Sequence, residues 1–153
     1  MLNTRYAINT ASLDVLKRFY KNNAALFFPK MFETTDLLME YVEKLKNNAE
    51  IFEAYDDDAL IGVVAVYLNN MQTKVGFITS VIVDKKYHRN GVANQLIKAL
   101  ISSEKLKLFR AIDLYVYKDN MIAINLYKKH GFTINNDQHS CKIKDFVTMS
   151  LAL

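Results

Sequence analysis

The sequence predicts a mixed α/β (α+β) fold, with a central twisted sheet of about six to seven strands flanked by about four helices. Two observations carry this prediction. Apolar residues recur at helical spacing in several segments, and apolar runs of strand length, bounded by turn residues, lie between them. At 153 residues, 51% of them hydrophobic, the chain is expected to form one domain over residues 1–153 with its own core.

The chain is predicted to begin with a short strand and a helix. The strand lies near Tyr6–Ile8, and Thr10 or Ser12 caps the helix that follows. Pro29 ends this region. The apolar face of the helix consists of Leu13, Leu16, Phe19 and Tyr20.

A second helix and two strands come next. Thr34 or Thr35 caps the helix. Ile51–Tyr55 and Leu60–Leu68 are predicted strands, joined by a turn over the aspartates at 56–58.

The second half of the chain alternates strands and helices. A nearly continuous apolar strand spans Val75–Val83, as expected where both faces of a sheet are covered. A helix begins at or just before Gly91, a strand spans Ile112–Tyr117, and a helix spans Met121–His130. Gly131 ends that helix. Two short strands complete the chain, Phe132–Asn135 and Phe146–Leu153.

Composition excludes several classes of protein. Lys and Arg total 20 and Asp and Glu total 16, and this net charge of +4 is too small to favour a nucleic-acid partner. The start of the chain is polar and no apolar run approaches the roughly 18–20 residues that cross a bilayer, so no membrane partner is expected. The single cysteine, Cys141, excludes an internal disulfide and a thiolate zinc cluster, so no metal is expected. We therefore expect a soluble, cytoplasmic protein.

A candidate phosphate site lies where the predicted strand Val75–Val83 gives way to a helix. The first turn of a helix has unpaired N–H groups and the positive end of a dipole. Gly91 removes a Cβ where a phosphate would approach, and Ala93 is the next smallest residue. Four cationic or basic side chains precede the helix: Lys85, Lys86, His88 and Arg89. Alternatively, Asn90 is an ordinary helix cap and the lysines form a solvated turn.

The spacing of this segment favours the first interpretation. His88-x-x-Gly91-x-Ala93 resembles the Arg/Gln-x-x-Gly-x-Gly/Ala signature of the GNAT acetyltransferase superfamily. A second segment, residues 120–132, looks like the Asn-x-x-Ala-x-x-Leu-Tyr-x-Lys-x-Gly-Phe segment of the same superfamily. Its Asn120, Ala123 and Tyr127 share one helix face. The resemblance covers the whole chain in element order.

The resemblance implies acetyl-CoA as the cofactor. Strand backbone would pair with the pantetheine arm, the helix start would hold the pyrophosphate, and Tyr127 would lie beside the sulfur. The implied cofactor-binding residues are Val81, Ile82, Val83, His88, Arg89, Asn90, Gly91, Val92, Ala93, Asn94, Asn120 and Tyr127.

Tyr127 is the predicted catalytic residue. A tyrosine hydroxyl, with a pKa of about 10, can protonate a leaving thiolate whose pKa is near 8.5. Alternatively, Tyr127 is a packed core ring with a hydrogen-bonded hydroxyl. Strand N–H groups near Val83 are candidate oxyanion donors.

No general base is evident. Some superfamily members carry a carboxylate at the positions of Phe77 or Tyr115, and this chain has none at either. We therefore expect that the amine loses its proton either through a water relay or to a base from a variable loop. The loop candidates are Glu33, Asp137 and His139.

The predicted acceptor is the primary amine of a small molecule, such as an amino sugar or similar metabolite, or of a peptide, attacking directly in a ternary complex. The stretch Leu26–Phe32 and the loop Asp137–Lys144 are expected to build its pocket, although the former could equally be core. Four aromatic residues are the predicted walls: Phe28, Phe32, Phe77 and Tyr115. A non-catalytic acyl-CoA-binding module and, less favoured, a basic nucleic-acid-binding domain are the alternatives. Monomer and homodimer both stay open.

Overall fold

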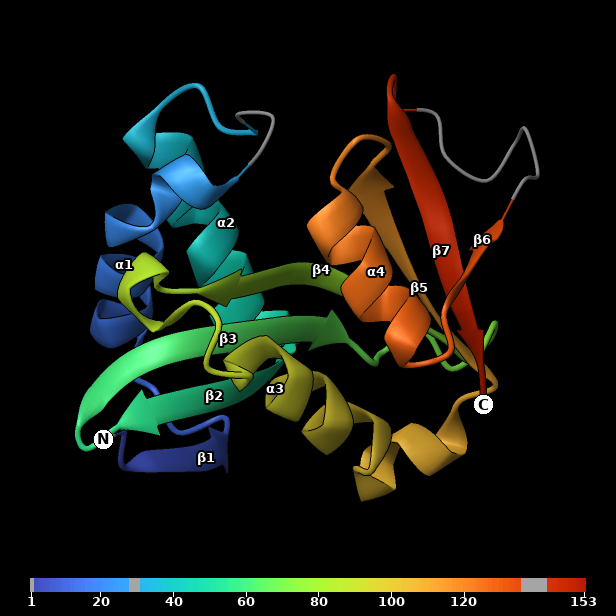
Figure 1. Cartoon of the computed structure of the whole chain (residues 1–153), viewed down its shortest axis with the longest axis horizontal. Coiled ribbons are helices and arrows are strands. Elements are labelled where there is room, and N and C mark those ends of the chain that lie inside the picture. Colours follow the sequence, from blue (N-terminus) through green and yellow to red (C-terminus); the bar gives the residue numbers. More distant parts are fainter. Residues whose placement is uncertain (1, 28–30, 136–142) are drawn as a thin grey trace.

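In the computed structural model, the described residues are 2–27, 31–135 and 143–153. They form one mixed sheet of seven strands in the order β1-β2-β3-β4-β5-β7-β6, with four α-helices (Figure 1). The strands are β1 (Thr4–Ile8), β2 (Glu50–Asp56), β3 (Ala59–Tyr67), β4 (Val75–Val83), β5 (Ala111–Tyr117), β6 (Thr133–Asn135) and β7 (Phe146–Ala152). The helices are α1 (Leu13–Asn22), α2 (Thr35–Asn48), α3 (Val92–Ile101) and α4 (Met121–Lys129). The predicted fold class and element order are confirmed.

The structure adds three short 3-10 helices that the sequence did not predict. They are η1 (Ala24–Leu26), η2 (Lys85–Tyr87) and η3 (Glu104–Leu108). The segment between β4 and α3 thus contains a helical turn. The Asp84 side chain caps this turn by accepting a hydrogen bond from the Lys86 N–H, at 3.0 Å.

Helices cover both faces of the sheet, which explains the continuous apolar runs of the central strands. Leu16 of α1 and Leu45 of α2 pack with Val63 against one face. On the other face, α3 and α4 pack against side chains such as Leu114 (Figure 1). Residues 61–66 of β3 are all buried, because successive side chains point into two different cores.

The capping residues decide between the predicted alternatives. Ser12 Oγ accepts a hydrogen bond from the Val15 N–H at the start of α1, at 3.2 Å. Thr34 Oγ1 accepts one from the Leu37 N–H at the start of α2, at 3.1 Å. Thr10 does not cap α1, because its backbone and hydroxyl contact a carboxylate instead.

That carboxylate belongs to Glu53, which has no exposed surface although it carries a charge-bearing side chain. Its oxygens accept hydrogen bonds from the N–H groups of Thr10 (3.1 Å) and Ala11 (3.0 Å) and from the hydroxyls of Thr10 and Tyr55. These donors replace water around the carboxylate. Glu53 thereby fixes the β1–α1 connection to β2.

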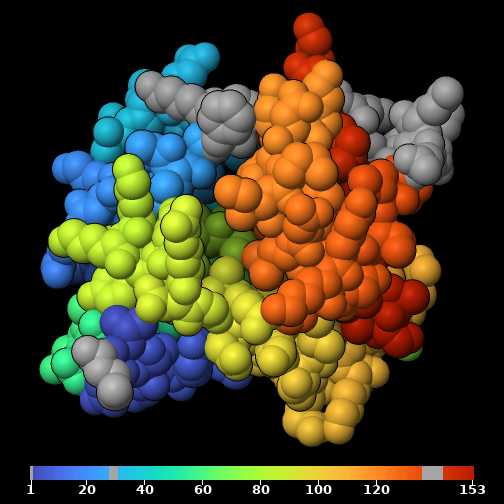
Figure 2. Space-filling model, viewed as in Figure 1, coloured from blue at the N-terminus to red at the C-terminus, as the bar shows by residue number. Residues whose placement is uncertain are grey.

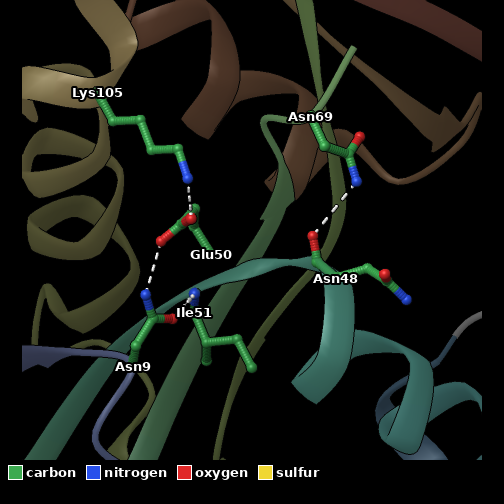
Figure 3. Close-up of polar contacts among 6 residues, drawn as sticks. All are labelled: Asn9, Asn48, Glu50, Ile51, Asn69 and Lys105. Carbon is green, nitrogen blue, oxygen red and sulfur yellow. Dashed lines mark hydrogen bonds and ion pairs between the residues drawn. The ribbon is translucent and has the colours of Figure 1, made fainter.

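A second polar cluster fixes the same connection at the start of β2 (Figure 3). Asn9 exchanges hydrogen bonds with Ile51, and its side-chain amide donates to Glu50 at 2.6 Å. Lys105 of η3 forms an ion pair with Glu50. Partial burial alone would raise the pKa of Glu50, but the hydrogen bonds from Lys105 and Asn9 and the Lys105 charge outweigh it and lower the pKa. Segments far apart in sequence are thus joined at the first residues of β2.

Candidate functional site

The site is created by the divergence of two neighbouring parallel strands. Residues 75–78 of β4 pair with residues 111–114 of β5. Beyond that point, residues 79–83 and 115–117 continue as strands without pairing with each other (Figure 1). One edge of β4 therefore has backbone groups that face a gap rather than a neighbouring strand.

A β-bulge in β4 coincides with this divergence. In the ladder to β3, Ala65 lies opposite Ser80 and Val66 opposite Ile78, so Thr79 is the extra residue. A bulge bends its strand and increases the local twist. Because it falls where the parallel pairing stops, it accounts for the turning of β4 away from β5.

Two tyrosines hold the bulge from α1 and α2. The Tyr20 hydroxyl shares a hydrogen bond of 2.7 Å with Ser80 Oγ, and the Tyr41 hydroxyl shares one of 2.8 Å with Thr79 Oγ1. Burial is the main cause that raises the pKa of both tyrosines above its usual value. Both hydroxyls are therefore neutral at physiological pH.

An open cavity of about 130 Å³ occupies the gap. Figure 2 shows a hollow between the segment around η2 and α4, with the central sheet at its floor. Of the residues predicted from sequence, Val81, Ile82, Tyr115, Asn120 and Tyr127 line the cavity. Ala123, from the predicted helix face, and Phe27 and Met31, from the stretch predicted to form the pocket, line it as well. Lining residues that the prediction did not name include Thr79, Ser80 and Phe146.

The start of α3 is open to a ligand. Its first helical hydrogen bond runs from the Gln95 N–H to the Gly91 carbonyl, and no described side chain caps it. Gly91 has a φ of +73°, and a Cβ placed there would meet no atom within 4 Å. Glycine is therefore favoured by the backbone conformation, and the space in front of the helix is free. Val92, Ala93 and Asn94 follow with N–H groups that precede the first helical bond.

The side chains before α3 differ in what they contact. The His88 ring makes a 2.7 Å hydrogen bond through Nε2 to the Val83 carbonyl, which fixes it to the end of β4. The Asn90 amide donates back to the carbonyls of Tyr87 and His88, both at 3.1 Å. Arg89, with a φ of +66°, is exposed. The backbone and Arg89, more than His88 or the Asn90 side chain, are thus available to an anion.

Tyr127 lies both in the core and beside the cavity. Only 8% of it is exposed, and its ring centroid lies 5.9 Å from that of Phe132 in the core. It also lines the cavity, and burial raises the pKa of its hydroxyl above the usual value. Asn120 caps α4 by accepting a hydrogen bond from the Ala123 N–H at 3.2 Å, and all three residues of the predicted helix face line the cavity.

Of the predicted aromatic wall residues that the structure describes, one lines the cavity and two pack behind the lining. Tyr115 lines the cavity and packs edge-on against Phe77, whose ring centroid is 4.8 Å away but which does not line it. Phe32 packs against Tyr41 and Phe27, behind the lining. Among residues outside the described part of the chain are Phe28, Pro29, Asp137, His139 and Cys141.

No described lining residue is an acid or a base other than tyrosine. Glu33 is exposed and does not line the cavity. Across the described ranges, no group of three or more His, Cys, Asp and Glu residues could hold a metal ion. Nor does the described part of the chain contain a helix that is long and apolar enough to cross a membrane.

Comparisons with known proteins point to one family. The model of the acetyltransferase (GNAT) family matches residues 11–132. N-alpha-acetyltransferase 20 of Dictyostelium discoideum is 38% identical over 60 residues, which cover 39% of this chain and 35% of that protein. The matched stretches span 35% and 21% of the two curated relatives, well under half of either.

Solved structures share the fold over nearly the whole chain. An acetyltransferase from Thermus thermophilus has a TM-score of 0.78 at 13% identity, with 100% of both chains covered. Arabidopsis thaliana Naa50, in complex with the bisubstrate analogue CoA-Ac-MVNAL, has a TM-score of 0.70 at 21% identity, covering 97% of this chain and 99% of that one. At these identities the likeness establishes the fold.

Proposed function

Because this chain belongs to the acetyltransferase (GNAT) family, we propose that it is an acetyl-CoA-dependent N-acetyltransferase acting on the primary amine of a small molecule or a peptide. The observation that carries the proposal is the cavity between the diverging strands, with the open start of α3 and the buried Tyr127 beside it. The bisubstrate analogue bound by Naa50 joins CoA to a peptide, which supports both halves of the proposed reaction.

The described residues fit coenzyme A. The unpaired edge of β4 at Val81–Val83 offers backbone groups to an amide chain, as an added strand would use them, apart from the Val83 carbonyl that already bonds His88. The N–H groups at the start of α3 offer the partial positive charge that a pyrophosphate requires. Arg89 is exposed beside them, and Gly91 leaves the approach free of a Cβ.

Bound acetyl-CoA would supply the acetyl group as a thioester. In the proposed transfer, the C–N bond forms, the C–S bond breaks, and the amine loses a proton to water. The Tyr127 Oη holds a proton at neutral pH, because burial raises its pKa. The raised pKa also makes it a weaker acid, so it can deliver that proton only as the C–S bond breaks, to a thiolate whose own pKa is raised by the same burial. Water then returns a proton to Tyr127.

The proposed reaction is tested by following free thiol released from acetyl-CoA over a panel of amines. Tyr127→Phe should lower kcat by about a hundredfold or more if the hydroxyl acts as the acid. Tyr6→Phe, at a partly exposed tyrosine of β1, is the matched control and should retain full activity. An unchanged kcat in Tyr127→Phe would show that the Tyr127 hydroxyl is not the acid and that the residue serves only in packing.

A non-catalytic acyl-CoA-binding module is the second candidate, favoured by the absence of carboxylates among the described lining residues. It predicts that acetyl-CoA raises the melting temperature while no amine is consumed. A cytoplasmic location belongs to the proposal and is supported by the single cysteine, which fits a reducing compartment.

A further inference from the structure

The described lining of the cavity contains no charged side chain, and this limits what can bind there. Its titratable groups are tyrosines: Tyr115 and Tyr117 on β5 and Tyr127 on α4, with Tyr20 and Tyr41 behind. A second ammonium group on an acceptor would lose its hydration there without gaining a counter-charge, which is unfavourable.

Most of the cavity's other polar side chains are already bonded within the protein. Thr79 and Ser80 share hydrogen bonds with tyrosines of α2 and α1, and the Asn120 oxygen accepts from the Ala123 N–H. An acceptor rich in hydroxyls, such as an amino sugar, would compete with these bonds. The cavity therefore favours an apolar acceptor body.

The mouth of the cavity is also apolar. Met31 and Tyr115 line the cavity and remain 53% and 42% exposed. Exposed apolar side chains gathered at a cavity mark a binding surface.

Resting on the proposed N-acetyltransferase function, we propose that the acceptor is a weakly basic primary amine next to an apolar or aromatic group, with no second charge nearby. This chemistry is found at the N-terminus of a peptide that begins with an apolar residue, and in free amino-acid amides. The basicity matters because the described site has no carboxylate to remove a proton from an ammonium. At pH 7.5, about a quarter of an α-amine with a pKa near 8 is neutral, against about 0.1% of an alkylamine with a pKa near 10.4.

Four small amines separate the requirement for low basicity from the requirement for an apolar body. Phenylalanine amide is apolar and weakly basic, phenethylamine is apolar and strongly basic, glucosamine is polar and weakly basic, and spermidine is a polycation. We expect the kcat/KM of phenylalanine amide at pH 7.5 to exceed each of the others by roughly tenfold or more. A pentapeptide beginning with phenylalanine is compared with phenylalanine amide. A higher kcat/KM for either one supports the proposal and shows whether the amine belongs to a peptide or to a small molecule.

The pH dependence provides a second readout. With no base among the described lining residues, kcat/KM should rise with pH up to the pKa of each acceptor, and so inflect at a different pH for each amine. One inflection shared by all acceptors would reveal a base on the enzyme and overturn the proposal. A preference for spermidine or glucosamine would overturn it while leaving N-acetylation intact. If no amine is acetylated although acetyl-CoA binds, the proposed function itself fails.

A carboxylate placed at the mouth should change the preference. Tyr115→Glu should raise the ratio of spermidine to phenylalanine amide turnover by roughly fivefold or more, and Tyr115→Phe should leave that ratio unchanged. If Tyr115→Glu does not fold, Met31→Glu tests the same point at another exposed residue that lines the cavity. An unchanged ratio in a folded carboxylate variant would show that the charge of the lining does not select the acceptor.

Discussion

Replacing Gly91 with alanine tests whether the start of α3 binds phosphate. Gly91 has a φ of +73°, and an L-residue in that left-handed conformation costs about 1–2 kcal/mol. A Cβ there would meet no atom within 4 Å, so no clash adds to this cost. We expect Gly91→Ala to lower the melting temperature by roughly 2–8 °C, the range for a chain of this size.

The effect on coenzyme A should be larger than the effect on folding. The added methyl lies where the pyrophosphate would approach the N–H groups of α3, so the Kd for coenzyme A should rise about tenfold or more, which is about 1.4 kcal/mol. Isothermal titration calorimetry measures this Kd. Gly91→Asn should recover most of the stability, because asparagine tolerates the left-handed region, but not the affinity.

Gly131 is the matched control, because it also has a positive φ, of +96°, but lies at the end of α4. Gly131→Ala should destabilise the protein and leave the Kd unchanged. Its added Cβ would lie 3.2 Å from the Leu151 side chain, so its stability cost should be at least as large. If Gly91→Ala binds coenzyme A as tightly as the wild type, or if both variants lose the same affinity, the phosphate site is not at this helix start.

Three further predictions concern stability. Glu53→Gln should cost about 2–3 kcal/mol in urea unfolding, because an amide cannot accept all the hydrogen bonds that the carboxylate accepts; a cost under half of that would contradict this account. Burial, and then nearby lysines, lower the pKa of His130 from its usual 6.5, so the folded state binds a proton less readily than the unfolded state. Stability should therefore fall as the pH drops below 6.5, and His130→Asn should flatten that dependence in melting curves recorded over a series of pH values. Glu50→Gln should lower the free energy of unfolding by about 0.2–1 kcal/mol at pH 7. Because the pKa of Glu50 is lowered, the difference in stability between variant and wild type should disappear as the pH falls below about 4.5. A difference that persists at about pH 3 would exclude the ion pair with Lys105 as its cause.

Local sequence signals predicted the elements well, because they act over short distances. The apolar run Val75–Val83 marks β4 to its end residues, and Gly131 ends α4 with a positive φ. The sequence alone could not decide whether Thr10 or Ser12 caps the helix, because Thr10 hydrogen-bonds to Glu53, which lies far along the chain. Long-range pairing decided between two good capping residues.

The features that create the cavity were the least predictable. The bulge at Thr79 exists only in the pairing of β4 with β3, and nothing in the local sequence marks it. Tyr20 was correctly placed on the apolar face of its helix, but its hydroxyl contact with Ser80 depends on how α1 packs on the sheet. Phe27 and Met31 belong to a stretch that was predicted to form the pocket, yet sequence could not say which of its residues face inward.

The short parallel ladder between β4 and β5 divides the sheet into two parts. On one side are the antiparallel strands β1 to β4, and on the other β5, β7 and β6; residues 75–78 and 111–114 are the seam. A ligand bound between the strands would extend that seam along the unpaired edge of β4. Hydrogen exchange in β5 and β7 should then slow together with that of β4 on binding, so that two separately opening units become one.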